Sequence, residues 1–507
     1  MSLGPRSLKH GNLGYEADHM RLPRASGVLL HPTSLPGRFG IGDFGAEAYR
    51  FVDFLCDAGQ RIWQVLPLGL IGEGDSPYKS ISAFGGSPLL ISPERLAERG
   101  YLTRSDLADV PKFSEVEVDF EKVVPYKLAL LRRAFARFKQ TEDYREFEEH
   151  NRLWLDPFAH FLALKIANDG VTWTRWDPAK QASEVEINLQ KFLQFEFSRQ
   201  WGELRQYCHG RGIRIMGDIP FYVEHDSADV WTNPEMFDLD ERGNPRAVGG
   251  VPPDYFSATG QLWGNPTYRW DRFDQSGYRW WVERFRATFA AVDIVRLDHF
   301  RGFEAYWEVP ASERNAVNGR WVPGPGAKLF EAVQKELGPL PIVAENLGVI
   351  TPEVEDLRNR FSFPGMKVLQ FAFASDHGAR TFLPHNYCRN LIAYTGTHDN
   401  DTTVGWWTSL GQDGTWSQKD RQCEQESAQA YFGTNGTEIN WDFIRAVMAS
   451  VADTAMIPMQ DLLGLGSEAR MNRPGTPTGN WRWRCRTGAL TPELARRLRA
   501  LTEWCER

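Results

Sequence analysis

Short apolar runs rich in β-branched residues recur along the chain, and each ends in a polar or glycine-containing stretch. Near-continuous apolar runs of this length are typical of strands buried on both faces, as in parallel sheets. There are eight of them, at 26–32, 61–68, 213–221, 293–300, 341–348, 365–373, 391–399 and 454–464.

Helical patterns lie between most of these runs. Apolar residues recur at helical spacing in 45–59 and 197–212, and both segments end on glycine. Residues 351–361 begin with Thr351 as an N-cap and Pro352 at the first helical position. Strands that alternate with helices indicate βαβ units, and eight of them predict an α/β fold, the (β/α)₈ (TIM) barrel.

The spacing of the runs predicts two insertions in one catalytic domain over residues 23–507. Residues 69–212 are rich in charged, helix-forming sequence, and we expect a mostly helical subdomain after strand 2. Residues 222–290, after strand 3, contain a stretch full of Gly, Pro, Asn and aromatic residues at 240–270, which predicts a loop-rich subdomain. Residues 1–22 form a polar N-terminal lead-in with no apolar segment typical of a signal peptide.

Composition narrows the class of protein. The net charge of −8 over 507 residues argues against a nucleic-acid-binding protein, which usually carries a basic patch. The six cysteines are scattered without a C-x-x-C pair, so we expect reduced thiols and a cytoplasmic location. No apolar stretch reaches eighteen residues, so we expect no membrane association.

Acidic residues stand at the ends of several predicted strands. Asp218 ends the third, Asp298 the fourth, Glu345 the fifth and Asp399 the seventh. Taken singly, each acid is typical of a capping or solvated residue. Because the carboxyl ends of barrel strands form one face, four acids at equivalent ends predict a single active site there. Three more candidate side chains adjoin these acids, namely Arg296, His299 and His398.

These residue types suit acid/base chemistry on a neutral substrate. Two carboxyl groups that flank a scissile bond are the arrangement for cleaving a glycosidic bond. Arg296 lies two residues before Asp298, on the same face of the strand, and would keep that carboxylate ionised. Glu345 has the amide Asn346 as its neighbour rather than a charge, which suits a carboxyl group of raised pKa.

Two competing chemistries are less well supported. His and Asp also ligate metals, but the sequence has no H-x-H or H-x-x-x-H spacing, so we expect no metal. The stretch GIGDFG (40–45) fits a dinucleotide fingerprint, but it does not follow its strand directly, and no acidic residue ends the next strand. We expect these glycines to shape a loop at the rim of the barrel, and we expect no cofactor.

Several long motifs together resemble the 4-α-glucanotransferases, or amylomaltases, of glycoside hydrolase family 77. The resemblance runs from about residue 22 to the C-terminus. Its motifs include LLHPTSLPGRFGIGDFG, GDSPYKSISAFGGSPLLI, GVPPDYFSATGQLWGNPTYRW, VRLDHFRGFEAYWEVP, AENLGVITPEVEDLR, YTGTHDNDTTVGWW and GSEARMNRPGTPTGNWRWR.

The resemblance implies a retaining double displacement on α-1,4-glucans, with glucose or a maltooligosaccharide as acceptor. Asp298 matches the nucleophile, Glu345 the general acid/base, and Asp399 the third carboxylate, which holds sugar hydroxyls. The family often has Asp after the acid/base Glu, where this chain has Asn346. The resemblance also implies that the substrate is bound by Ser76, Tyr78, Asp218, Tyr255, Phe256, Trp263, Arg296, His299, His398 and Asn472. Tyr255 and Phe256 match a loop that covers the site in this family.

Alternatives stay open at this point. After the last predicted strand only about forty residues remain, too few for the β-sandwich typical of α-amylases. Hydrolysis of the same glucans on the same site is possible, because water and a sugar hydroxyl attack the same intermediate. A glucan-binding protein with relic carboxylates is a further alternative, which the intact Asp298, Glu345 and Asp399 argue against.

Overall fold

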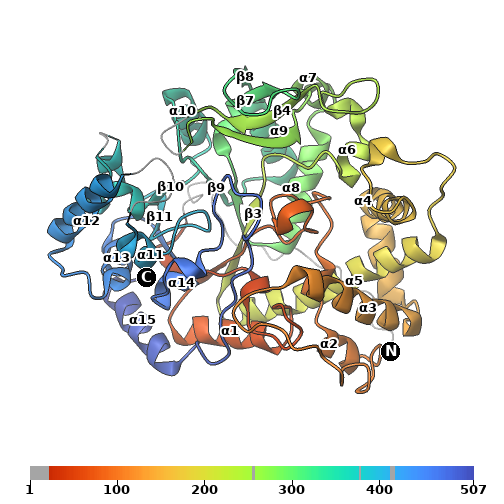
Figure 1. The fold of residues 1–507 in the computed structure, drawn as a ribbon, viewed down its shortest axis with the longest axis horizontal. Coiled ribbons are helices and arrows are strands. Elements are labelled where there is room, and N and C mark those ends of the chain that lie inside the picture. The colour runs from red at the N-terminus through yellow and green to blue at the C-terminus, as the bar shows by residue number, and fades with distance from the viewer. Residues whose placement is uncertain (1–21, 254–256, 376–377, 411–416) are drawn as a thin grey trace, which may run out of the picture.

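The structure is a computed structural model of the chain, and it describes residues 22–253, 257–375, 378–410 and 417–507. Its larger sheet has eight strands, each parallel to its neighbours (Figure 1). In sheet order they are β10 (Gly365–Val368), β11 (Leu391–Tyr394), β12 (Thr454–Pro458), β1 (Ala25–Leu29), β2 (Ile62–Gln64), β3 (Arg214–Ile219), β6 (Ile294–Leu297) and β9 (Ile342–Ala344). Each of the eight predicted apolar runs overlaps one of these strands, and β1 begins one residue before its run, so the predicted set is confirmed.

The two outer strands of this sheet, β9 and β10, meet and nearly close it into a barrel. The backbone N–H of Ala344 donates to the carbonyl of Pro364, directly before β10, at 2.9 Å. The N–H of Met366 donates to the side-chain oxygen of Asn346 at 2.8 Å. A Cβ on Gly365 would lie 2.9 Å from that same oxygen, so glycine leaves room for the Asn346 side chain at the seam.

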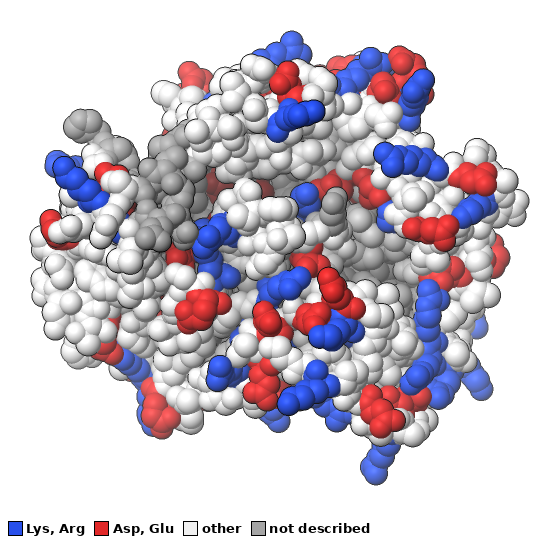
Figure 2. All heavy atoms as spheres, viewed as in Figure 1, with Lys and Arg blue, Asp and Glu red and all other residues white. Residues whose placement is uncertain are grey.

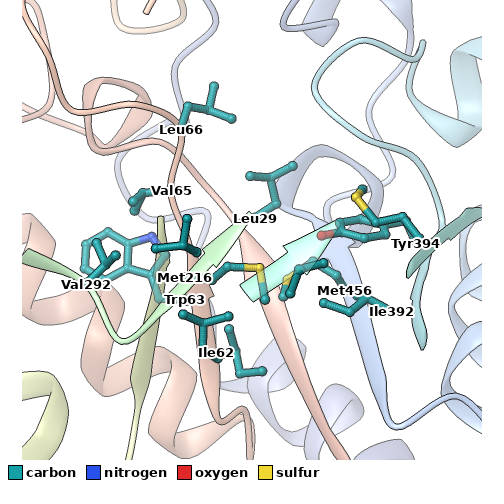
Figure 3. Close-up of a cluster of buried hydrophobic side chains, with 14 of the residues drawn as sticks. Leu29, Ile62, Trp63, Val65, Leu66, Met216, Val292, Ile392, Tyr394 and Met456 are labelled. Carbon is teal, nitrogen blue, oxygen red and sulfur yellow. The ribbon is translucent and has the colours of Figure 1, made fainter. Parts of the chain in front are cut away.

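Large apolar side chains fill and surround the barrel. Figure 3 shows side chains from several parallel strands meeting at its centre, among them Leu29, Ile62, Met216, Ile392 and Met456. All five are at most 5% exposed. Strands with apolar residues on both faces are therefore buried on both faces, as the near-continuous runs predicted.

Helices cover the outside of the barrel (Figure 1). Among them are α1 (Ala46–Asp57), α5 (Glu184–Gly210), α8 (Arg279–Ala291), α9 (Ala327–Leu337), α10 (Pro352–Arg360), α13 (Ile439–Ala449) and α15 (Pro492–Trp504). The predictions for 45–59 and 351–361 are confirmed as α1 and α10. The pattern at 197–212 is the C-terminal part of the longer α5.

Residues 69–212 are mostly helical, with α2 (Pro93–Glu98), α3 (Phe120–Arg137) and α4 (Glu142–Ala167) preceding α5. A separate cluster of buried apolar residues, including Leu96, Leu131 and Phe192, joins α2, α3 and α5. These helices lie together on one side of the barrel in Figure 1. The boundaries of this subdomain remain a prediction.

The loop interpretation of residues 240–270 is wrong in part, because two strands of a second sheet lie there. This antiparallel sheet has the order β5 (Gln261–Pro266), β4 (Ala247–Val251), β7 (Ala305–Pro310) and β8 (Arg320–Pro323). The sequences of β4 and β5 are AVGGV and QLWGNP, so no β-branched run marks them. They are strands because β4 pairs with both β5 and β7, and β7 comes from beyond barrel strand β6.

The remaining helices are α6 (Ala228–Thr232), α7 (Trp270–Gln275), α11 (Thr403–Thr408), α12 (Gln418–Phe432) and α14 (Met459–Leu462). Residues 459–507, all of them described, contain helices and turns but no strand, in agreement with the expected lack of a β-sandwich there. All six cysteines are free. No helix in the described part of the chain is long and apolar enough to cross a membrane.

The glycines of GIGDFG shape a tight loop, as predicted. Gly42 lies so close to the turn after β1 that a Cβ on it would be 2.0 Å from the carbonyl oxygen of Pro32. Gly45 is the N-cap of α1. A Cβ on Gly40 or Gly45 would meet the side chains of Phe113 or Asp43, so close packing within the protein accounts for these glycines.

Candidate active site

The register of neighbouring barrel strands places the acidic residues. Asp218 of β3 pairs with Arg296 of β6. Leu297 of β6 pairs with Ala344 of β9, so the residues that follow, Asp298 and Glu345, leave the barrel side by side. The predicted cluster at the carboxyl ends of the strands is therefore present.

Arg296 joins two of these carboxylates. Its Nη1 atom donates to Oδ2 of Asp218 at 2.6 Å and to Oδ1 of Asp298 at 2.9 Å. The side chains of Arg296 and Asp218 are 4% and 0% exposed, whereas that of Asp298 is 28% exposed. Burial raises the pKa of Asp218, and the positive charge of Arg296 opposes that rise. The arginine thus orients the Asp298 carboxyl group at the solvent-accessible edge of a buried ion pair.

Glu345 is held by backbone N–H groups rather than by a cation. Its Oε2 accepts from the N–H of His299, and its Oε1 accepts from the N–H of Leu347, both at 2.8 Å. Burial raises the pKa of Glu345 to about 7, and the negative charge of Asp298 adds to the rise while Arg296 opposes it. The two neighbouring carboxyl groups therefore differ in their surroundings, one paired with arginine and one desolvated.

His299 links Asp298 to Glu345 through its backbone. Its φ of +49° is in the left-handed region, which is uncommon for a residue other than glycine. His299 directly follows Asp298 in the chain, and this conformation directs its backbone N–H toward Glu345. Burial lowers the pKa of the His299 imidazole to about 4, so the ring is neutral, and its Nε2 atom has no hydrogen-bond partner among the described residues. Trp263 meets this ring edge-on, with centroids 4.9 Å apart.

Asp399 lies on the loop after β11 and is held by the C-terminal segment. Nδ2 of Asn472 donates to Oδ1 of Asp399 at 2.6 Å, and Nε2 of His398 lies 3.4 Å from Oδ2. Nη2 of Arg470 donates to the backbone carbonyl of Asp399 at 2.8 Å. The Asp399 side chain is 44% exposed, so this carboxylate is oriented by the protein but open to a ligand.

A group of aromatic rings joins the two sides of the site. Tyr78 donates its hydroxyl hydrogen to Oδ2 of Asp218 at 2.8 Å, and its ring stacks on His398 with centroids 5.0 Å apart. Trp481 lies 5.8 Å from both rings. Ser76 supports this arrangement because its hydroxyl accepts from the N–H of Tyr78 at 3.3 Å.

The structure therefore brings most of the predicted residues into linked contacts, with some exceptions. Tyr255 and Phe256 lie outside the described residues. Two further residues that contact the site, Arg470 and Trp481, were not predicted from the sequence, although they lie in the quoted motif GSEARMNRPGTPTGNWRWR. Only the tertiary contacts to Asp399 and to Tyr78 distinguish them from the other residues of that motif.

A pocket lies at the ends of β1, β11 and β12, next to His398. Its lining includes His31, Gln460 and Asp461. Burial and the neighbouring His398 lower the pKa of His31 to about 3, so this imidazole is neutral. In the described part of the chain, no three His, Cys, Asp or Glu residues are grouped as a metal site.

A parallel eight-stranded barrel with paired carboxylates around an arginine at its carboxyl end defines an enzyme acting on glycosidic bonds. Comparison with known proteins specifies the family. The 4-alpha-glucanotransferase profile of glycoside hydrolase family 77 matches residues 30–491. The chain belongs to this family.

Comparison with individual proteins supports the same family. The 4-alpha-glucanotransferase of Synechocystis sp. is 50% identical, over 95% of this chain and 97% of that protein. The enzyme of the same description from Thermus thermophilus is 49% identical, over 96% of this chain and 100% of that protein. The amylomaltase from Streptococcus agalactiae, solved in complex with acarbose, has a TM-score of 0.89 and 39% identity, over 96% of this chain and 99% of that one. The transferase activity is thus supported, and the hydrolase alternative is not favoured.

Proposed function

We propose that this protein transfers a segment of an α-1,4-glucan to the 4-hydroxyl of glucose or of a maltooligosaccharide by a retaining double displacement. The observation that carries the proposal is the contrast between Asp298, bonded to Arg296, and Glu345, whose pKa burial raises to about 7. One carboxyl group suits a nucleophile, and the other suits a proton donor.

In the first step, a carboxylate oxygen of Asp298 attacks C1 of the donor sugar. The bond from C1 to the glycosidic oxygen breaks, and protonated Glu345 gives its proton to that oxygen, so the leaving glucan departs with a free 4-hydroxyl. The hydrogen bond from Arg296 orients the Asp298 carboxyl group before attack. We expect the two carboxyl groups to be separated by about 5–5.5 Å, the distance typical of retaining enzymes.

In the second step, the 4-hydroxyl oxygen of the acceptor attacks C1 and releases Asp298. Glu345, now ionised, takes the proton of that hydroxyl. Exclusion of water from the closed site would favour the sugar acceptor over hydrolysis.

The other contacts suit the binding of sugar hydroxyls. Oδ1 of Asp218 and Nε2 of His299 are buried and have no hydrogen-bond partner in the described part of the chain, and a bound hydroxyl would satisfy either atom. Asp399, oriented by Asn472, would accept from hydroxyls as positive charge develops at C1 in the transition state. Tyr78 and Trp263 offer rings against which a sugar can pack.

Incubation with maltotriose tests the proposal. Transfer produces glucose together with longer oligosaccharides, which mass spectrometry resolves by size. Formation of glucose and maltose alone, with no longer product, would contradict transfer and indicate hydrolysis. Anomeric configuration of the products, followed by NMR, checks retention.

A further inference from the structure

We infer that Asp461 is a positioning residue that places Asp399 by holding both ends of the loop that carries it. The inference rests on the proposed role of Asp399 in binding the substrate.

Asp461 is a buried carboxylate with each oxygen bonded to a different end of this loop. It lies in α14, just after barrel strand β12, and is 1% exposed. Its Oδ2 accepts from the hydroxyl of Thr395 at 2.5 Å, and its Oδ1 accepts from the backbone N–H of Thr403 at 2.6 Å. Asp399 lies between these two threonines.

The two anchor points are themselves fixed. Thr395 directly follows β11, and its N–H donates to the carbonyl of Met456 in β12 at 3.4 Å. Thr403 is the first residue of α11. Asp461 is held in turn by Asn440 of α13, whose Nδ2 donates to the Asp461 carbonyl at 2.9 Å.

Burying a carboxylate away from water is costly unless its oxygens are hydrogen-bonded. Here two short bonds offset that cost, and both go to the loop rather than to the rest of the barrel. Without Asp461, the Thr403 N–H and the Thr395 hydroxyl lose a buried acceptor, and the loop ends become free to move. A shift of about 1 Å in a binding group can cost on the order of 100-fold in rate.

The binding of acarbose, measured by calorimetry, tests this inference through a double-mutant cycle. We expect Asp461→Ala to weaken binding about tenfold or more in the otherwise unchanged protein. In an Asp399→Asn background, we expect Asp461→Ala to cause little further loss, because the group it positions is already impaired. We also expect kcat/KM on maltotriose to fall in parallel with acarbose affinity.

Two further variants separate positioning from general support of the fold. Asp461→Asn keeps an acceptor for Thr403 and can donate to the Thr395 hydroxyl, so it should restore binding to within about threefold of the wild type. Thr395→Val removes one bond while keeping the shape, and it should reproduce part of the loss even if Asp461→Ala fails to fold. Thr408→Val is the matched control, because its hydroxyl donates to the carbonyls of Val404 and Gly405 in its own helix, and it should bind acarbose normally.

The outcomes distinguish failure of the proposed role of Asp399 from failure of the positioning role of Asp461. If Asp399→Asn binds acarbose like the wild type, the proposed role of Asp399 is wrong. If Asp399→Asn weakens binding and the second substitution, Asp461→Ala or Thr395→Val, adds its full loss on top, Asp461 does not act through Asp399 and the inference is overturned.

Discussion

At the scale of single residues, the different roles proposed for Asp298 and Glu345 follow from the groups that each carboxyl group contacts. Asp298 shares the guanidinium of Arg296 with Asp218, whereas the Glu345 carboxyl group accepts from two backbone N–H groups. A cation favours the ionised form of a carboxyl group, and removal from water favours the neutral form. Two acids that follow neighbouring strands are thereby suited to different tasks.

Trapping the covalent intermediate tests this assignment. Glu345→Gln should lose at least about 100-fold in activity on maltotriose, because the leaving sugar needs a proton. α-Glucosyl fluoride has a leaving group that needs little protonation, so it should still glycosylate the variant. Mass spectrometry of the digested protein should locate the sugar on Asp298.

Asp399→Asn is the control for this experiment. It should not be rescued by the fluoride, because its loss weakens binding of the transition state rather than proton transfer. An adduct on Asp218 or Asp399 would mean that the roles are assigned to the wrong carboxylates.

The raised pKa of Glu345 predicts the pH dependence. Since the group must be protonated to act as the acid, kcat/KM on maltotriose should fall as the pH rises through about 7. The rate at which α-glucosyl fluoride glycosylates Glu345→Gln should not show this fall at high pH, the basic limb of the pH profile. If the limb persists in that variant, another group, with Asp218 the first candidate, is the one that titrates.

The same pKa shift affects stability with a defined sign. Folded Glu345 holds its proton more tightly than the unfolded chain does, where the pKa is near 4.5. Its contribution therefore favours the folded state at low pH and is lost as the pH rises from about 4.5 through about 7.

At the scale of elements, a side chain adds to the backbone hydrogen bond that joins β9 and β10. Asn346 connects the seam between β9 and β10 to helix α10. Its oxygen accepts from the N–H of Met366, and its Nδ2 donates to Oε1 of Glu355 at 2.7 Å. Oε2 of Glu355 also accepts from Arg358. The amide thus supplies one acceptor and one donor at a point where the residue also adjoins Glu345.

Replacing the amide by a carboxylate tests this arrangement. Asn346→Asp keeps the acceptor for Met366 but places a second negative charge against Glu355, and we expect a loss of about 1–3 kcal/mol in the free energy of unfolding. Denaturant unfolding measures it. Adding Glu355→Gln restores a donor opposite the introduced carboxylate, so the double variant should recover most of the loss. Equal stability of Asn346→Asp and the wild type would show that the seam does not need the amide.

At the scale of the whole molecule, one continuous core joins the barrel to its helices. Trp63 of β2 is fully buried, its Nε1 donates to the carbonyl of Leu30 at 2.8 Å, and its ring meets those of Phe51 in α1 and Trp201 in α5. On the surface, acidic and basic side chains are interspersed, as Figure 2 shows for one face. The cytoplasmic location inferred from the cysteines remains a prediction.

A pair of tryptophan substitutions tests how stability is distributed. Trp63→Ala should cost about 3–5 kcal/mol in the free energy of unfolding, because it leaves a cavity between three elements. Trp504→Ala is the matched control, since that side chain is 89% exposed, and its effect should stay within about 0.5 kcal/mol. Similar losses from both substitutions, measured by denaturant unfolding, would contradict the assigned core.

The amino-acid sequence by itself determined the eight barrel strands and the acids at their ends. Strands buried on both faces need apolar residues at nearly every position, so the runs are visible locally, and the barrel topology then requires their ends to share one face. Asp218, Asp298, Glu345 and Asp399 could therefore be found without coordinates. The motifs around them also identified the family.

Only the tertiary structure decided what these side chains contact. Strands β4 and β5 carry little β-branched sequence, and their sheet exists because β7 pairs with β4 from a distant part of the chain. The register between β3 and β6 sets Arg296 against Asp218, and the bonds from Asp461 span 66 and 58 residues. Local sequence carries apolar periodicity and turn chemistry, but the partner of a buried polar group is chosen by the packing of the whole chain.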